Sequence, residues 1–217
     1  MHRNIFICAV TLAAIIYIGC GADKVIGSPE KSVLAYVETI TTGESPNMAE
    51  AGFTEADNKN LGNILVKAFA ESFTGVIPLN EETLAELGKT FHAHCKANMT
   101  FQAKLKTSDG NPVVELTTTP LDMDTATKMA TSNDELIALF GMVGKLKAEG
   151  ATDEQLLNNS DVQKLAVSAL GKYIESIPVK EEKTIDIPCA KIDGSDGNTH
   201  WAPAKVPALT DFVMGKK

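Results

Sequence analysis

Residues 99–119 read MTFQAKLKTSDGNPVVELTTT. From Met99 to Lys106 apolar and polar side chains alternate, and this period of two is typical of a strand with one buried face. Residues 108–112 are turn formers, and Val113 to Thr119 has the composition of a returning strand. The middle of the chain is therefore predicted to form an antiparallel β-hairpin.

Helical patterns flank this hairpin on both sides. The first helix is predicted to begin at Ser28-Pro29-Glu30, because serine caps helices and proline suits their first position, and to end at Gly43. Between the hairpin and Pro178 the helical pattern covers 122–147, with an interruption near 132–133, and then resumes. The other predicted helix starts are Thr54 or Asp57, Asn80, the capping box of Thr152 and Gln155, and Ser160.

The C-terminal region predicts a second hairpin. Its strands are residues 184–192 and 199–202, and a loop of strong turn formers, 193–198, joins them. Leu209, Phe212 and Val213 suit a final turn that packs back on the core. The pattern predicts an α+β fold in which helices pack on a curved antiparallel sheet built from hairpins, as one domain over 28–217.

Composition excludes one large class of function. The chain has 217 residues, of which 44% are hydrophobic and 22% charged, as in an ordinary globular protein. Its formal net charge is −8, and Arg3 is its only arginine. A nucleic-acid-binding protein would present a basic, arginine-rich surface, so nucleic acid is not an expected partner.

The N-terminal segment has the features of a targeting signal. Arg3 precedes an apolar run, Ile5 to Ile18, which is shorter than the roughly 20 residues that span a bilayer. The run ends in Tyr17-Ile18-Gly19-Cys20, which resembles the lipobox of bacterial lipoproteins, although Tyr17 replaces the usual leucine.

This resemblance implies a signal peptide over 1–19 and a lipid on Cys20. Residues 20–27 would then be the lipidated cysteine with a short tether, which would hold the domain on the outer, extracytoplasmic face of the cell membrane. The alternatives are an uncleaved anchor and a plain secretory signal.

The tail carries a second resemblance. Residues 185–189, 193–194, 200–203 and 209–212 are similar to the C-terminal signature of an uncharacterised bacterial lipoprotein family, domain of unknown function 5105. The opening helix and its Gly43-Glu44 turn resemble small secreted domains of the nuclear transport factor 2-like type. The resemblance implies a cone, with helices on the concave side of the sheet, and carries no catalytic residues.

Two cysteines of the predicted domain are expected to point inward. Cys95 is in register with the apolar face of the third helix, and Cys189 lies on the strand face that carries Ile185 and Ile187. Both positions suit a disulfide, which would close a loop of roughly 95 residues. The alternative is two separate buried thiols.

No standard catalytic, nucleotide-binding or metalloprotease motif occurs. Trp201, His200 and Tyr173 are candidates for lining a pocket. His92 and Cys95 share a helix face and could join Cys189 or His200 at a soft metal, whereas His94 points about 200° away from His92. No metal and no cofactor are expected, and the histidines and thiols are interpreted as ordinary surface and core residues.

Three functional hypotheses follow. The first is a non-catalytic, membrane-tethered domain that binds an unknown small molecule or envelope protein. The second is a small enzyme of isomerase or dehydratase type, with His200, Tyr173 or Asp186 as acid or base in an apolar cup. The third is a structural role in the cell envelope.

Overall fold

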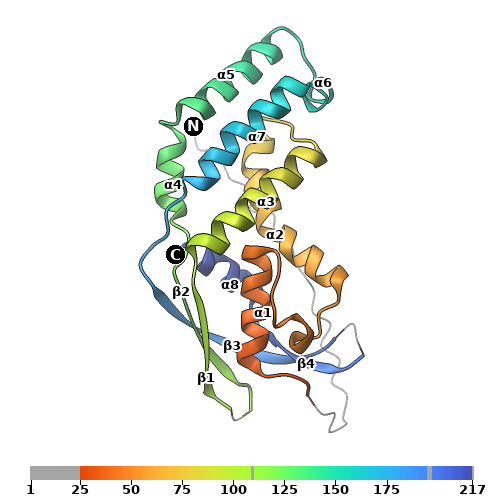
Figure 1. The fold of residues 1–217 in the computed structure, drawn as a ribbon, viewed down its shortest axis with the longest axis vertical. Coiled ribbons are helices and arrows are strands. Elements are labelled where there is room, and N and C mark those ends of the chain that lie inside the picture. The colour runs from red at the N-terminus through yellow and green to blue at the C-terminus, as the bar shows by residue number, and fades with distance from the viewer. Residues whose placement is uncertain (1–24, 109, 195–196, 217) are drawn as a thin grey trace, which may run out of the picture.

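The computed structural model describes residues 25–108, 110–194 and 197–216, and Figure 1 shows their arrangement. Both predicted hairpins are present. The first pairs β1 (Phe101–Thr107) with β2 (Val113–Thr118), and the second pairs β3 (Lys183–Asp193) with β4 (Thr199–Pro203). All pairings are antiparallel, and the strands form one sheet in the order β1-β2-β3-β4.

Strand β3 joins the two hairpins by changing its partner along its length. Its first half, from Lys183 to Pro188, pairs with β2, and its second half, from Cys189 to Asp193, pairs with β4. Pro188 has no N–H to donate, and it stands where one pairing ends and the other begins. The sheet is open and antiparallel, and helices pack on it, which confirms the predicted α+β fold class.

The helices lie in three groups along the chain. α1 (Pro29–Thr42), the short 3₁₀ helix η1 (Met48–Ala51), α2 (Glu55–Thr74) and α3 (Glu81–Asn98) precede the first hairpin. α4 (Met123–Ala130), α5 (Asp134–Ala148), α6 (Asp153–Leu157) and α7 (Ser160–Glu175) lie between the hairpins. α8 (Val206–Val213) follows the second hairpin.

Most helix starts are where the capping residues predict them. Thr54 and Asp57 form a capping box at α2, Thr152 and Gln155 form one at α6, and the Asn80 side chain caps α3. Two predicted caps differ. Ser28 occupies the N-cap position of α1, but its side chain forms no capping hydrogen bond. Asn159, not Ser160, caps α7, because its side-chain oxygen accepts the N–H of Val162 at 3.1 Å and that of the intervening Asp161 at 3.0 Å. Ser160 is the first residue inside the helix.

Helix α1 is the centre of the packing. It contacts β1, β2 and β4 on its sheet side, and α2, α3 and α8 elsewhere. α3 in turn packs on α7, and α7 on α5, so the helices extend away from the sheet in successive layers (Figure 1). Val33, Val37 and Ile40 of α1 are completely buried, and so are its hydroxyl residues Ser32 and Thr39.

The end of α1 depends on a glycine. Gly43 has φ +78°, and a Cβ at this position would lie 2.6 Å from the His92 ring of α3. Gly62 of α2 approaches the same point, because a Cβ on it would lie 3.3 Å from the Gly43 Cα. Three helices therefore meet at Gly43.

We predict that Gly43→Ala lowers the free energy of unfolding by about 1–3 kcal/mol, because alanine is strained at positive φ and its methyl group displaces His92. The matched control is Gly144→Ala in α5. No atom lies within 4 Å of the added methyl group there, so the helical alanine is expected to raise stability by about 0.5–1 kcal/mol. Urea denaturation measures both changes, and equal effects of the two variants would contradict the account.

Candidate functional site

An open groove lies where the end of α1, the turn that follows it, the end of α3 and the start of β1 come together. Its volume is about 480 Å³. Its lining combines polar and charged side chains with an apolar surface to which Pro46, Met99 and Phe101 contribute. The polar lining residues are Glu38, Thr42, Glu44, Ser45 and Lys96.

Glu38 is the charged group that the groove positions most firmly. Its Oε2 accepts a hydrogen bond from the Ser45 hydroxyl and a long one, 3.5 Å, from the Asn47 side-chain amide. The Ser45 hydroxyl also accepts the Asn47 backbone N–H at 3.1 Å. These donors are neutral, and within 25–216, apart from the gaps, Glu38 forms no ion pair. Its negative charge is thus held in place without being neutralised.

The other two charges of the groove neutralise each other. Lys96 Nζ lies 2.7 Å from Glu44 Oε1, and this hydrogen bond and charge hold the pKa of the Glu44 carboxyl below its usual value. Both side chains are about two-thirds exposed, at 66% and 67%. Solvent therefore screens the pair, which contributes little to stability.

A second open groove, of about 490 Å³, lies beside α3 and the end of α7. Lys89, His94 and Glu175 are among its lining residues. One His94 ring nitrogen lies 2.8 Å from the Ile177 carbonyl oxygen and so donates to it. This bond ties the end of α3 to the end of α7, which is a structural role.

The structure does not bring the three predicted pocket residues together. Tyr173 on α7 is buried among aromatic rings, 6.1 Å from both Phe69 and Phe73 of α2 between ring centroids. His200 on β4 is fully buried, and its Nδ1 donates to the Glu50 carbonyl oxygen at 3.1 Å. Neither these residues nor Trp201 line either of the two grooves.

Trp201 lies next to His200 on β4, so its side chain points to the opposite face of the sheet. It is half-buried, and Lys191 Nζ of the paired strand lies 5.6 Å from its ring, which is a cation–π contact. Asp186, the third acid–base candidate, is bound to Lys106 at 2.9 Å on the outer sheet face.

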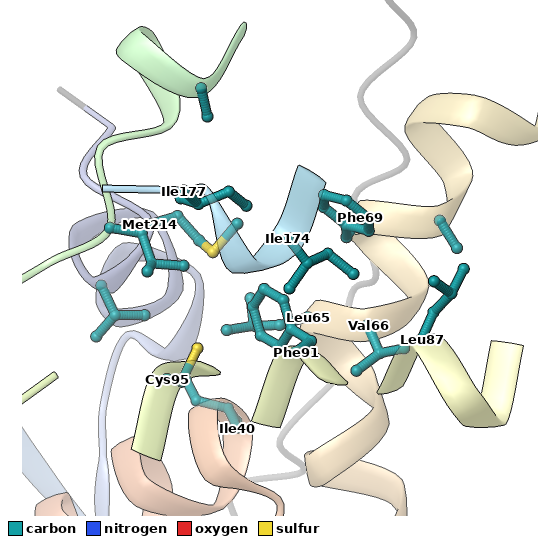
Figure 2. Packing of buried hydrophobic residues seen from close by; sticks show 14 of the residues in the cluster. Ile40, Leu65, Val66, Phe69, Leu87, Phe91, Cys95, Ile174, Ile177 and Met214 are labelled. Carbon is teal, nitrogen blue, oxygen red and sulfur yellow. The ribbon is translucent and has the colours of Figure 1, made fainter. Parts of the chain in front are cut away.

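The predicted disulfide between Cys95 and Cys189 is absent from the structure, in which both are free buried thiols. The inward orientation of each residue was predicted correctly, but the two thiols lie near opposite ends of α1. Cys95, on α3, packs near the C-terminal end of α1. Figure 2 shows it beside Ile40 of α1, and the next residue of α3, Lys96, pairs with Glu44 just after α1. Cys189 is close enough to Glu30, in the first turn of α1, for that charge to affect its pKa.

Glu30 and Ile40 are ten residues apart in a helix, which corresponds to about 15 Å. A disulfide needs Cα atoms within roughly 7 Å, so the two cysteines are too far apart to be bonded.

Burial raises the pKa of the Cys95 thiol to about 12. The pKa of Cys189 is also raised to about 12, mainly by burial and further by the Glu30 charge.

The histidines and thiols considered for a metal have other roles. The His92 ring donates to the Gly62 carbonyl oxygen at 2.9 Å, so it links α3 to α2. His94 points about 200° away from His92 on the same helix, and its ring donates to the Ile177 carbonyl oxygen after α7. In the part of the chain that the structure covers, no three histidine, cysteine or acidic side chains are grouped as metal ligands. Cys20, the predicted lipidation site, lies outside the described residues.

Comparison with known proteins gives one similarity of fold. No family model and no curated protein matches the sequence. The chain is similar in structure to ycdA of Bacillus subtilis subsp. subtilis strain 168, a protein described as a proposed lipoprotein. The TM-score is 0.55 at 16% sequence identity, over 88% of this chain and 56% of ycdA. The present chain thus spans little more than half of that protein, and the likeness establishes the fold alone.

Among the described residues, no helix combines the length and hydropathy needed to cross a bilayer. The groove was not predicted from the sequence. Its residues come from four short segments between 38 and 101, and none belongs to a recognised motif. The one available signal was the four-residue spacing of Glu38 and Thr42, which puts both on one side of α1 just before a turn.

We predict that both thiols of the native protein resist iodoacetamide, because only the thiolate reacts and burial disfavours it. After unfolding in urea without reductant, peptides containing Cys95 and Cys189 should both be alkylated to completion. Peptide mass spectrometry measures this. A disulfide-linked peptide pair, with neither residue alkylated, would contradict the structure.

We also predict that His92 makes the fold sensitive to mild acid. Burial lowers the pKa of His92 below its ordinary value of 6.5 in the folded chain, so the unfolded chain binds the proton more readily. The stability from neutral His92 is therefore present above about pH 6.5 and is lost as the pH falls through the lower, folded-state pKa.

The measurement is the free energy of unfolding between about pH 7 and pH 5. In His92→Gln, the free energy of unfolding should decrease less as the pH falls. His94→Gln keeps His92 and should show the same decrease as the wild type. An equal decrease in His92→Gln and the wild type would exclude His92 as the cause.

Proposed function

We propose that the protein is a lipid-anchored, extracytoplasmic lipoprotein whose folded domain binds a ligand and does not catalyse a reaction. The observation that carries the anchor is the apolar run that ends in Tyr17-Ile18-Gly19-Cys20. The similarity of fold to ycdA, itself described as a proposed lipoprotein, supports it. Membership of the family of domain of unknown function 5105 is part of the same proposal.

The site geometry favours binding over catalysis. The groove at the end of α1 exposes a positioned carboxylate beside apolar surface, and this arrangement suits recognition. The acid–base candidates of the enzyme hypothesis are placed differently. Tyr173 and His200 are buried and engaged with the core and with η1, and Asp186 is paired with Lys106 on the outer face.

The anchor is tested with the full chain in growing bacterial cells that carry a lipoprotein pathway. Wild-type chain should incorporate labelled palmitate and sediment with membranes. Cys20→Ala should lose the label and accumulate as the uncleaved precursor, because the acceptor thiol is gone. Cys8→Ala is the matched control within the same segment and should be labelled like the wild type. Continued labelling of Cys20→Ala would refute the lipid assignment.

A further inference from the structure

The groove at the end of α1 contains a negative charge that no group of the described chain neutralises. Glu38 is held by the Ser45 hydroxyl and the Asn47 amide, both neutral donors. Other acidic residues nearby have cations: Glu44 pairs with Lys96, and Glu50 pairs with Lys31. A cation that enters the groove therefore meets a carboxylate already in position, with no competing ion pair to break.

The surface beside Glu38 is apolar and suits a hydrocarbon stem. Most of the accessible apolar surface comes from Phe101, which is half-buried at the start of β1, and from the exposed Pro46, whereas Met99 lies beneath them and is only 6% exposed. A thioether and an aromatic ring both contact alkyl groups well, and an aromatic face also attracts a cation. Pro46 completes this side of the groove.

The charges favour a cation over an anion. Glu38, Glu44 and Lys96 together give the groove a net charge of −1, because two carboxylates oppose one ammonium group. The whole chain carries −8, so its long-range field also attracts cations and repels anions. The groove volume of about 480 Å³ is within the range of small-molecule sites.

We propose that this groove binds a small molecule with a primary ammonium group on an apolar stem. The ammonium group donates hydrogen bonds to the Glu38 carboxylate, and the stem lies against Met99 and Phe101. The proposal rests on the proposed role of the domain in binding, and it adds the chemical class of the ligand.

The test uses three probes with the same butyl stem, which are butylammonium, butanol and pentanoate. The full-length chain in a nonionic detergent is labelled with ¹³C at the methionine methyl groups and titrated with each probe. The Met99 signal, assigned with Met99→Leu, reports on the groove. Met142 on α5, at the far end of the helical layers, is the internal control for detergent effects (Figure 1).

We expect butylammonium alone to shift the Met99 signal in a saturable way, with Kd on the order of millimolar, because one exposed ion pair and a short stem give weak binding. Glu38→Gln keeps the side-chain shape and removes the charge, and should weaken binding about fivefold. Glu175→Gln removes a charge from the groove beside α3 and α7, and should leave the affinity unchanged.

Lys96→Gln provides a test of opposite sign. It frees Glu44 as a second carboxylate, so butylammonium should bind more tightly than to the wild type. A general loss of structure cannot produce a gain in affinity. Equal Met99 shifts with pentanoate, no saturable shift with butylammonium, or Glu38→Gln binding like the wild type would each overturn the ligand class. None of these results bears on the Cys20 anchor, which palmitate labelling tests separately.

Discussion

Burial of α1 on nearly all sides is the constraint on which the rest of the fold depends. A helix surrounded in this way needs partners for several faces at once. The sheet covers one face, α2 and α3 cover others, and Gly43 and Gly62 let the helix backbones approach. The close approach at Gly43 fixes the position of His92, and with it the distance between α3 and α2. The groove results from this packing, because it forms where α1 ends and the neighbouring α3 and β1 continue past it.

Local chemistry made most of the elements predictable. Period-two alternation in residues 99–106, turn formers in 108–112 and the capping residues Thr54, Asn80 and Thr152 each act within a few positions of the chain. The error at α7 is of the same local kind, because Asn159 and Ser160 are adjacent and both are good caps.

The predicted disulfide failed for a different reason. The periodicity of a single helix or strand shows which of its side chains face inward. The distance between Cys95 and Cys189, however, depends on how their two elements pack in the whole fold. Here one thiol lies near each end of α1, about the length of the helix apart. The groove escaped prediction on similar grounds, since Glu38, Ser45, Lys96 and Phe101 become neighbours only after the helices have packed. Likewise, Tyr173, His200 and Trp201 were candidates for lining one pocket, but packing places them in three separate environments.

The partner exchange of β3 has a consequence for how the domain can change in size. Thr118, the last residue of β2, is paired directly with Lys183, the first residue of β3. The 64 residues from 119 to 182, which contain α4 to α7, therefore leave and rejoin the sheet at adjacent points. The sheet itself is a simple meander, and this helical segment is an insertion into one of its connections. Because the entropy of closing a loop grows slowly with its length, the insertion can lengthen or shorten at the α5 and α6 end while strand order and the groove stay as they are.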